Sequence, residues 1–90
     1  MKKIPEEISL GPFVISVIYQ DSLIAEREAY GEWSGNTLEI RIQSGMEESK
    51  TREAFFHELL EAINEFYVLN LEHSAIKILG VSLAQALEGI

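Results

Sequence analysis

The strongest constraint on the fold is a run of apolar residues at three- and four-residue spacing in the second half of the chain. The run consists of Phe55, Phe56, Leu59, Leu60, Ile63, Phe66 and Tyr67. This spacing places the side chains on one side of an α-helix. It predicts a helix that begins near Lys50, with Ser49 as its N-cap, and ends near Val68.

A second helix is predicted after a short connection at residues 69–72, with Asn70 or Glu72 near its cap. Its apolar stripe consists of Ile76, Leu79, Leu83, Leu87 and Ile90. Gly80 within this helix predicts a close approach by a neighbouring element.

The first half of the chain carries the signals of β-strands. Residues 12–20 (PFVISVIYQ) are β-branched and aromatic with partial alternation. Residues 28–33 (EAYGEW) and 37–43 (TLEIRIQ) predict a hairpin with Gly35 and Asn36 at its turn and one buried face. The order of elements predicts an α+β fold in which a small three-stranded sheet, antiparallel or mixed, is followed by two packed helices.

The composition indicates one globular domain that spans residues 1–90. Apolar residues make up 47% of the chain and charged residues 24%, which is far from the composition of disordered chains. No repeat, linker or change of composition divides the 90 residues, and a chain of this length fills one small core.

Net charge, the length of the apolar runs, cysteine content and the N-terminal segment each bear on the function or location of the protein. The formal net charge of −8 argues against a nucleic-acid partner, because phosphate binding needs clustered lysine and arginine. The longest apolar piece, FVISVIY, is too short to cross a membrane. The chain has no cysteine, so a metal would be held by nitrogen and oxygen ligands. The start MKKIPEEISL lacks the apolar stretch of a signal peptide, and we expect a cytoplasmic location.

A histidine and two glutamates stand together on the first predicted helix. His57 and Glu61 are four residues apart, so about 40° separates them around the helix axis and both can reach one ion. Imidazole and carboxylate are both good zinc ligands. Glu58 lies at the edge of this face, where a carboxylate can accept a proton from an attacking water.

His73 is the candidate third ligand. It stands at the expected start of the second helix, where the positive end of the helix dipole disfavours imidazolium and so favours a ring able to ligate. Three protein ligands and one open position are typical of catalytic zinc. From Glu53 through Ile76 there is no lysine or arginine, so a bound dication would relieve the repulsion between Glu61 and Glu65.

Simpler interpretations of the same residues remain open. One such interpretation is that the glutamates of the first helix form a solvated acidic face and that His73 caps a helix or faces water. Trp33 and Tyr30 are predicted to pack in the core or against the hairpin. Asn64 either orients a ligand or faces solvent.

The stretch FFHELLEAINEFY, preceded by TLEIRI and followed by LNLEHSAIKILGVSLAQAL, resembles the zincin-like metallopeptidases, in particular the small phage-associated kind. The resemblance covers most of residues 28–88. It implies that His57 is the first metal ligand, Glu58 the general base and His73 the third ligand. Glu61 departs from the family pattern, since it gives H-E-x-x-E where the family has H-E-x-x-H, and it predicts a less acidic metal-bound water.

These observations lead to one leading hypothesis and two rivals. The leading one is a zinc-dependent hydrolase of peptide bonds, in which a peptide lies along the exposed edge of the hairpin. The first rival is a non-catalytic interaction module on the same scaffold, whose acidic face binds a basic protein. The second is a structural metal site that ties the two helices together.

Overall fold

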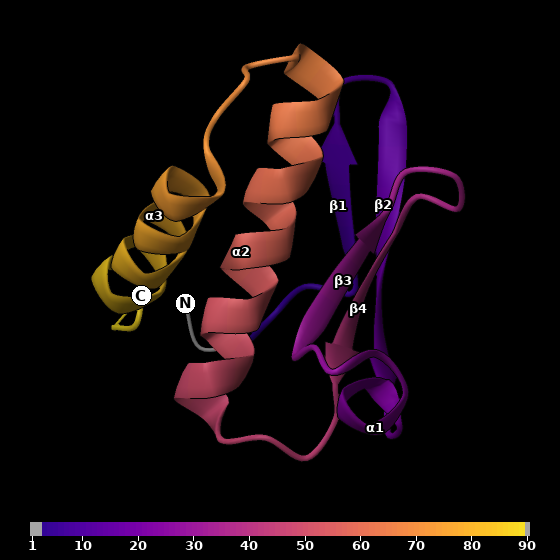
Figure 1. Cartoon of the computed structure of the whole chain (residues 1–90), viewed down its shortest axis with the longest axis vertical. Helices are drawn as coiled ribbons and strands as arrows, with labels where there is room; N and C mark the ends of the chain where they lie inside the picture. The colour runs from indigo at the N-terminus through magenta and orange to yellow at the C-terminus, as the bar shows by residue number, and fades with distance from the viewer. Residues whose placement is uncertain (1–2, 90) are drawn as a thin grey trace.

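A computed structural model describes residues 3–89 of the chain. It confirms the predicted α+β class and contains four strands rather than three (Figure 1). The elements in chain order are β1 (Glu7–Leu10), β2 (Phe13–Gln20), α1 (Leu23–Arg27), β3 (Gly31–Ser34), β4 (Glu39–Gln43), α2 (Glu48–Tyr67) and α3 (His73–Ala86).

The sheet is mixed, with strand order β1-β2-β4-β3. β1 pairs antiparallel with β2, β2 parallel with β4, and β3 antiparallel with β4. β1 was not predicted, because its apolar residues are few and follow a proline and two glutamates. Gly11, at φ +56°, makes the turn that folds β1 back onto β2. At the other end of this strand order, β3 forms an edge of the sheet.

The predicted hairpin is present with different bounds. Its first strand begins at Gly31 rather than at residue 28, because Glu28 ends the short helix α1 in a left-handed conformation with φ 53°. Its turn extends over residues 35–38, and Leu38, which alternation placed in the strand, has φ 55°. Helix α1 was not predicted. Its backbone is tied to β4 by the N–H of Ile24, which donates to Oε1 of Gln43 at 2.7 Å.

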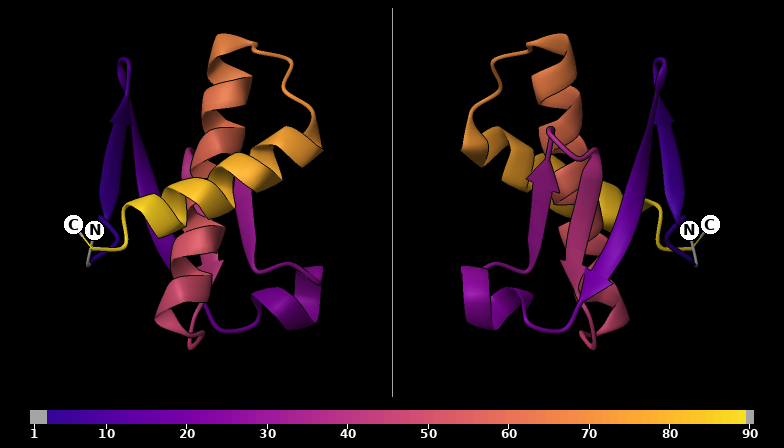
Figure 2. Two further views of the ribbon diagram at one scale, coloured as in Figure 1. Left: turned by 90° about the vertical axis from the view of Figure 1, so that its left-hand side faces the viewer. Right: turned by 90° about the vertical axis from the view of Figure 1, so that its right-hand side faces the viewer.

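Both long helices lie on one side of the sheet, with α2 between the sheet and α3 (Figure 1). α3 crosses α2 at a steep angle, as Figure 2 shows. The core lies between α2 and the sheet and includes Ile15, Ile40, Ile42, Phe55 and Phe56, all at most 5% exposed. α2 begins two residues earlier than predicted, and its N-cap is Glu47 instead of Ser49.

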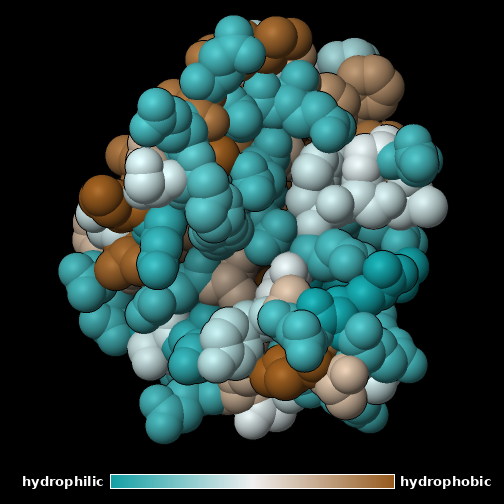
Figure 3. All heavy atoms as spheres, in the orientation of Figure 1, coloured by the Kyte–Doolittle hydropathy of each residue, from teal (hydrophilic) through white to brown (hydrophobic). Residues whose placement is uncertain are grey.

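The apolar stripe predicted for the second helix is only partly buried. Leu79 is 42% exposed and Leu83 36%, whereas Ile76, Gly80 and Ala84 are buried. α3 contacts α2 through this row at four-residue spacing, where Gly80 meets the backbone of His57, and the two leucines are left toward solvent. Hydrophobic side chains accordingly gather over α3 at the left of Figure 3. Ile90 lies outside the described residues.

Within residues 3–89, no helix combines the length and the apolar character that crossing a membrane requires. The cytoplasmic location stays a prediction of the sequence.

Candidate metal centre

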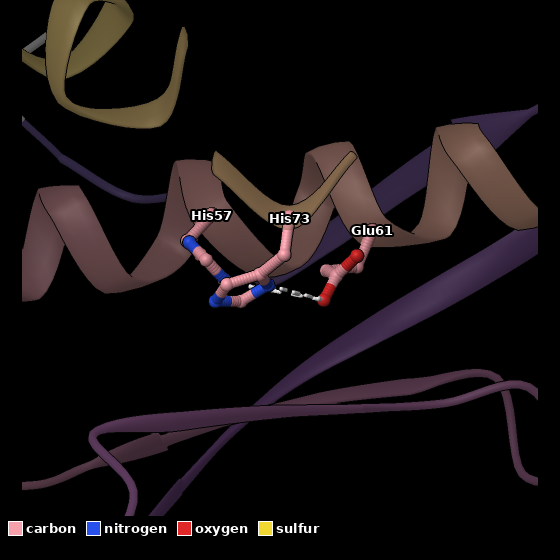
Figure 4. A group of neighbouring side chains, drawn as sticks. All are labelled: His57, Glu61 and His73. Carbon is pink, nitrogen blue, oxygen red and sulfur yellow. Dashed lines mark ion pairs between the residues drawn. The ribbon is translucent and has the colours of Figure 1, made fainter. Parts of the chain in front are cut away.

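The side chains of His57, Glu61 and His73 converge at the place where α3 begins beside α2 (Figure 4). Oε2 of Glu61 lies 3.8 Å from Nε2 of His57 and 3.9 Å from Nδ1 of His73. The two imidazole rings have their centroids 5.2 Å apart. One potential ligand atom from each residue can be chosen so that all three lie within 4.8 Å of one another.

These spacings fit a metal ion after small side-chain rotations. Two ligand atoms about 2.0–2.1 Å from a tetrahedral zinc ion lie about 3.4 Å apart. The pairs that include Glu61 are slightly wider than this, and the largely exposed imidazole of His73 has room to turn toward the other two ligands. Among the described residues this is the group of histidines and carboxylates with suitable geometry for a metal.

Local structure explains how His73 reaches a pair on another helix. α2 ends with Val68 in a left-handed conformation, and Asn70 is left-handed as well, so the chain reverses within a few residues. The side chain of Asn64 accepts a hydrogen bond from the N–H of Leu71 at 2.9 Å, and its main-chain oxygen accepts one from Leu69 at 3.1 Å. Asn64 thus holds the connection two residues before His73, which is a third role beside the two predicted for it.

The three candidate ligands differ in exposure. The side chains of His57 and Glu61 are 23% and 32% exposed, and that of His73 is 73% exposed. Burial lowers the pKa of His57, the nearby carboxylate of Glu61 opposes this shift, and the charges of His73 and Lys77 add to it. The net lowering of the pKa favours a neutral imidazole at position 57, which is the form that binds a metal.

Glu58 is the buried carboxyl group of the site, with 9% of its surface exposed. It packs against β3 where Gly31 has no side chain, since a Cβ at position 31 would lie 2.9 Å from Cγ of Glu58. Burial, together with the charges of Glu61 and Glu32, raises the pKa of Glu58 to about 7. A carboxyl group with a pKa near neutrality can both accept and return a proton at physiological pH.

A cleft of about 580 Å³ contains the three candidate ligands and Glu58. β3 and the segment before it form one wall, and α2 and α3 form the others. Trp33 and Tyr30 also line this cleft, although only a packing role was predicted for them. Trp33 also packs against Phe66, with ring centroids 5.8 Å apart, so its predicted packing role is present too.

The free edge of β3 borders the cleft. The main-chain oxygen of Tyr30 accepts a hydrogen bond from the N–H of Gln43, so the backbone of Tyr30 faces β4. Because backbone groups alternate in direction along an antiparallel pair, those of Gly31 and Trp33 face outward. The outward-facing N–H and C=O groups of these two residues could pair with the backbone of an extended peptide.

Comparisons with protein-family models, with curated proteins and with solved structures found no match for this chain. The fold and the site are those of an α+β protein with a candidate metal-ligand group in a cleft. The resemblance to zincin-like metallopeptidases stays a prediction that depends on the sequence motif.

Proposed function

We propose that the protein binds one divalent metal ion, preferably zinc, through His57, Glu61 and His73 and hydrolyses peptide bonds in the adjoining cleft. The observation that carries this proposal is the convergence of three ligand-type side chains from two helices, with ligand atoms within 4.8 Å of one another. Two imidazoles and one carboxylate form a donor set that catalytic zinc sites use. When bound, a zinc ion would supply Lewis acidity, which polarises a carbonyl group and makes water more acidic.

Glu58 is proposed as the general base. It lines the same cleft as the three ligands, and its pKa of about 7 suits a group that takes a proton from water and passes it to the leaving amine. The sequence resemblance to H-E-x-x-H metallopeptidases supports this role, because the position of Glu58 next to His57 is the one that the family uses for its base.

The proposed substrate is a peptide in extended conformation. The edge of β3 offers the backbone groups of Gly31 and Trp33, and pairing with them would lay the substrate along the wall of the cleft that faces the metal ligands.

Metal analysis tests the proposal. The chain is purified without chelator, stripped, and titrated with zinc, and we expect one zinc ion per chain. His57→Ala, His73→Ala and Glu61→Gln should each weaken zinc binding by at least about tenfold. Glu72→Gln is the matched control, because Glu72 neighbours His73 and its side chain caps nothing. A wild-type chain that takes up no zinc ends the proposal and leaves the interaction module.

The catalytic part has a separate test. Glu58→Gln should keep zinc and lose turnover of a quenched-fluorescence peptide library by at least about 100-fold. The second candidate function is a structural metal, and the origin of the ligands in two helices favours it over the interaction module. In that case chelation would lower the melting temperature, and the wild type would cleave no peptide in the library.

A further inference from the structure

Five basic side chains of this acidic protein lie either in ion pairs or in the cleft. All three arginines, Arg27, Arg41 and Arg52, pair with carboxylates at 2.8–3.9 Å. Lys50 and Lys77 both line the cleft, and neither has a carboxylate of residues 3–89 at ion-pair distance. Although the chain has 15 acidic residues against seven basic ones, these two exposed lysines lack acidic partners and are available to an anionic ligand in the cleft.

Both lysines lie near the candidate metal ligands. Lys77 follows His73 by one turn of α3, so the two side chains lie on the same side of that helix. The charge of Lys77 is also close enough to act on the imidazole of His57. Lys50 precedes His57 by about two turns of α2, and its Nζ stands 4.4 Å from the ring centroid of Tyr30.

Four glutamates line the cleft beside the two lysines, and one of them, Glu32, pairs with Arg27 outside it. Glu53 also lines the cleft between Lys50 and His57 along α2, and it forms an ion pair with neither lysine among the described residues. Two ammonium groups and the bound dication of the proposed function would carry four positive charges, against three negative charges at most from Glu53, Glu58 and Glu61. This leaves one positive charge in excess. An ammonium group is a compact point charge on a flexible stem, so it can follow a carboxylate to several positions.

We propose that the cleft selects peptides carrying a carboxylate, which Lys77 binds beside the His57–Glu61–His73 group with Lys50 as a second contact. The carboxylate belongs either to the C-terminus of the peptide or to an acidic side chain. This inference rests on the proposed function, since it assigns the substrate class of the same cleft.

Three short peptides serve as probes: N-acetyl-tetraalanine as the free acid, the same peptide as the C-terminal amide, and an amide in which one alanine is replaced by aspartate. Each is titrated at low salt into zinc-treated Glu58→Gln protein, which prevents hydrolysis during the measurement, and binding is followed by NMR shifts. We expect a carboxylate-bearing peptide to bind about three- to fivefold more tightly than the neutral amide. Which of the two acidic peptides binds more tightly identifies the source of the carboxylate.

Lysine variants assign the effect to the cleft. Lys77→Gln should remove most of the preference and Lys50→Gln part of it. Lys3→Gln, which removes an exposed lysine outside the cleft, should leave the preference intact. Equal binding of all three peptides, binding of none, or a preference that survives in both cleft variants overturns the inference. Zinc content is measured on the same samples, so failure of metal binding is distinguished from failure of peptide selection.

Discussion

Gly80 of α3 lies directly against the backbone of His57 in α2. A Cβ at position 80 would be 3.3 Å from both N and Cα of His57, which is tighter than ordinary van der Waals contact. The two helices therefore pack tightly at one of the candidate metal ligands. Any change of this contact moves α3, and with it His73, relative to His57 and Glu61.

Gly80→Ala should weaken zinc binding by about tenfold, as changes next to metal ligands commonly do. The effect on stability should be small, because a gain in helix propensity of about 1 kcal/mol opposes the cost of the close contact. Zinc titration and thermal unfolding of the stripped protein measure the two quantities. Gly89→Ala is the control, since nothing lies within 4 Å of a Cβ at that position. Unchanged zinc affinity in Gly80→Ala would show that the contact does not position His73.

The metal-free protein should lose stability as the pH rises from about 4.5 to above 7. The pKa of Glu58 is about 7 in the folded chain, above its ordinary value of 4.5. Because the pKa is higher in the folded chain than in the unfolded chain, the free energy of unfolding falls by up to about 3 kcal/mol as the carboxyl group ionises. Burial lowers the pKa of His57, which acts in the opposite direction by costing stability below its ordinary pKa of 6.5.

Glu58→Gln isolates the contribution of the carboxyl group. In the presence of chelator its free energy of unfolding should equal that of the wild type near pH 4.5 and exceed it at pH 8. Urea unfolding at several pH values gives both curves. Parallel curves for the two proteins would contradict the raised pKa.

Gly31→Ala should displace the carboxylate of Glu58 and keep the metal. The added Cβ would meet Cγ of Glu58 at 2.9 Å and Oε2 at 3.1 Å, so the glutamate side chain must turn away from β3. We expect peptide hydrolysis to fall at least about tenfold with zinc content unchanged. In the Glu58→Gln background the same substitution should cause no further loss of activity, and an additive loss would place the effect of Gly31 elsewhere.

Asn64→Leu should loosen the connection that carries His73. The substitution removes the acceptor of the hydrogen bond from Leu71, which costs about 1 kcal/mol of stability, and zinc affinity should fall with it. Asn64→Asp retains a side-chain oxygen acceptor and should restore both properties. Zinc affinity is the deciding measurement: if Asn64→Leu binds zinc as the wild type does, the connection does not place the third ligand.

Local patterns in the sequence predicted much of this fold. The three- and four-residue spacing of Phe55, Phe56 and Leu59 predicted α2, and the alternation around Ile40 and Ile42 predicted β4, because both signals depend on the period of a single element. The same local geometry placed His57 and Glu61 on one side of a helix. Pairing between segments that are distant in the sequence was harder to predict from local patterns. β1 exists through its ladder with β2, and Leu79 is exposed because the buried row that includes Ile76 and Gly80 makes the contact with α2.

The sequence by itself determined the α+β class, the two long helices and the presence of imidazole and carboxylate one helical turn apart, since these follow from backbone geometry over a few residues. Only the tertiary structure decided that His73 meets this pair, that Glu58 is buried beneath Gly31, and that Lys50 and Lys77 share the cleft. The physical reason is that these proximities depend on the angle and distance at which α3, α2 and β3 pack. Those quantities arise from the whole set of side chains at the interfaces rather than from any one segment.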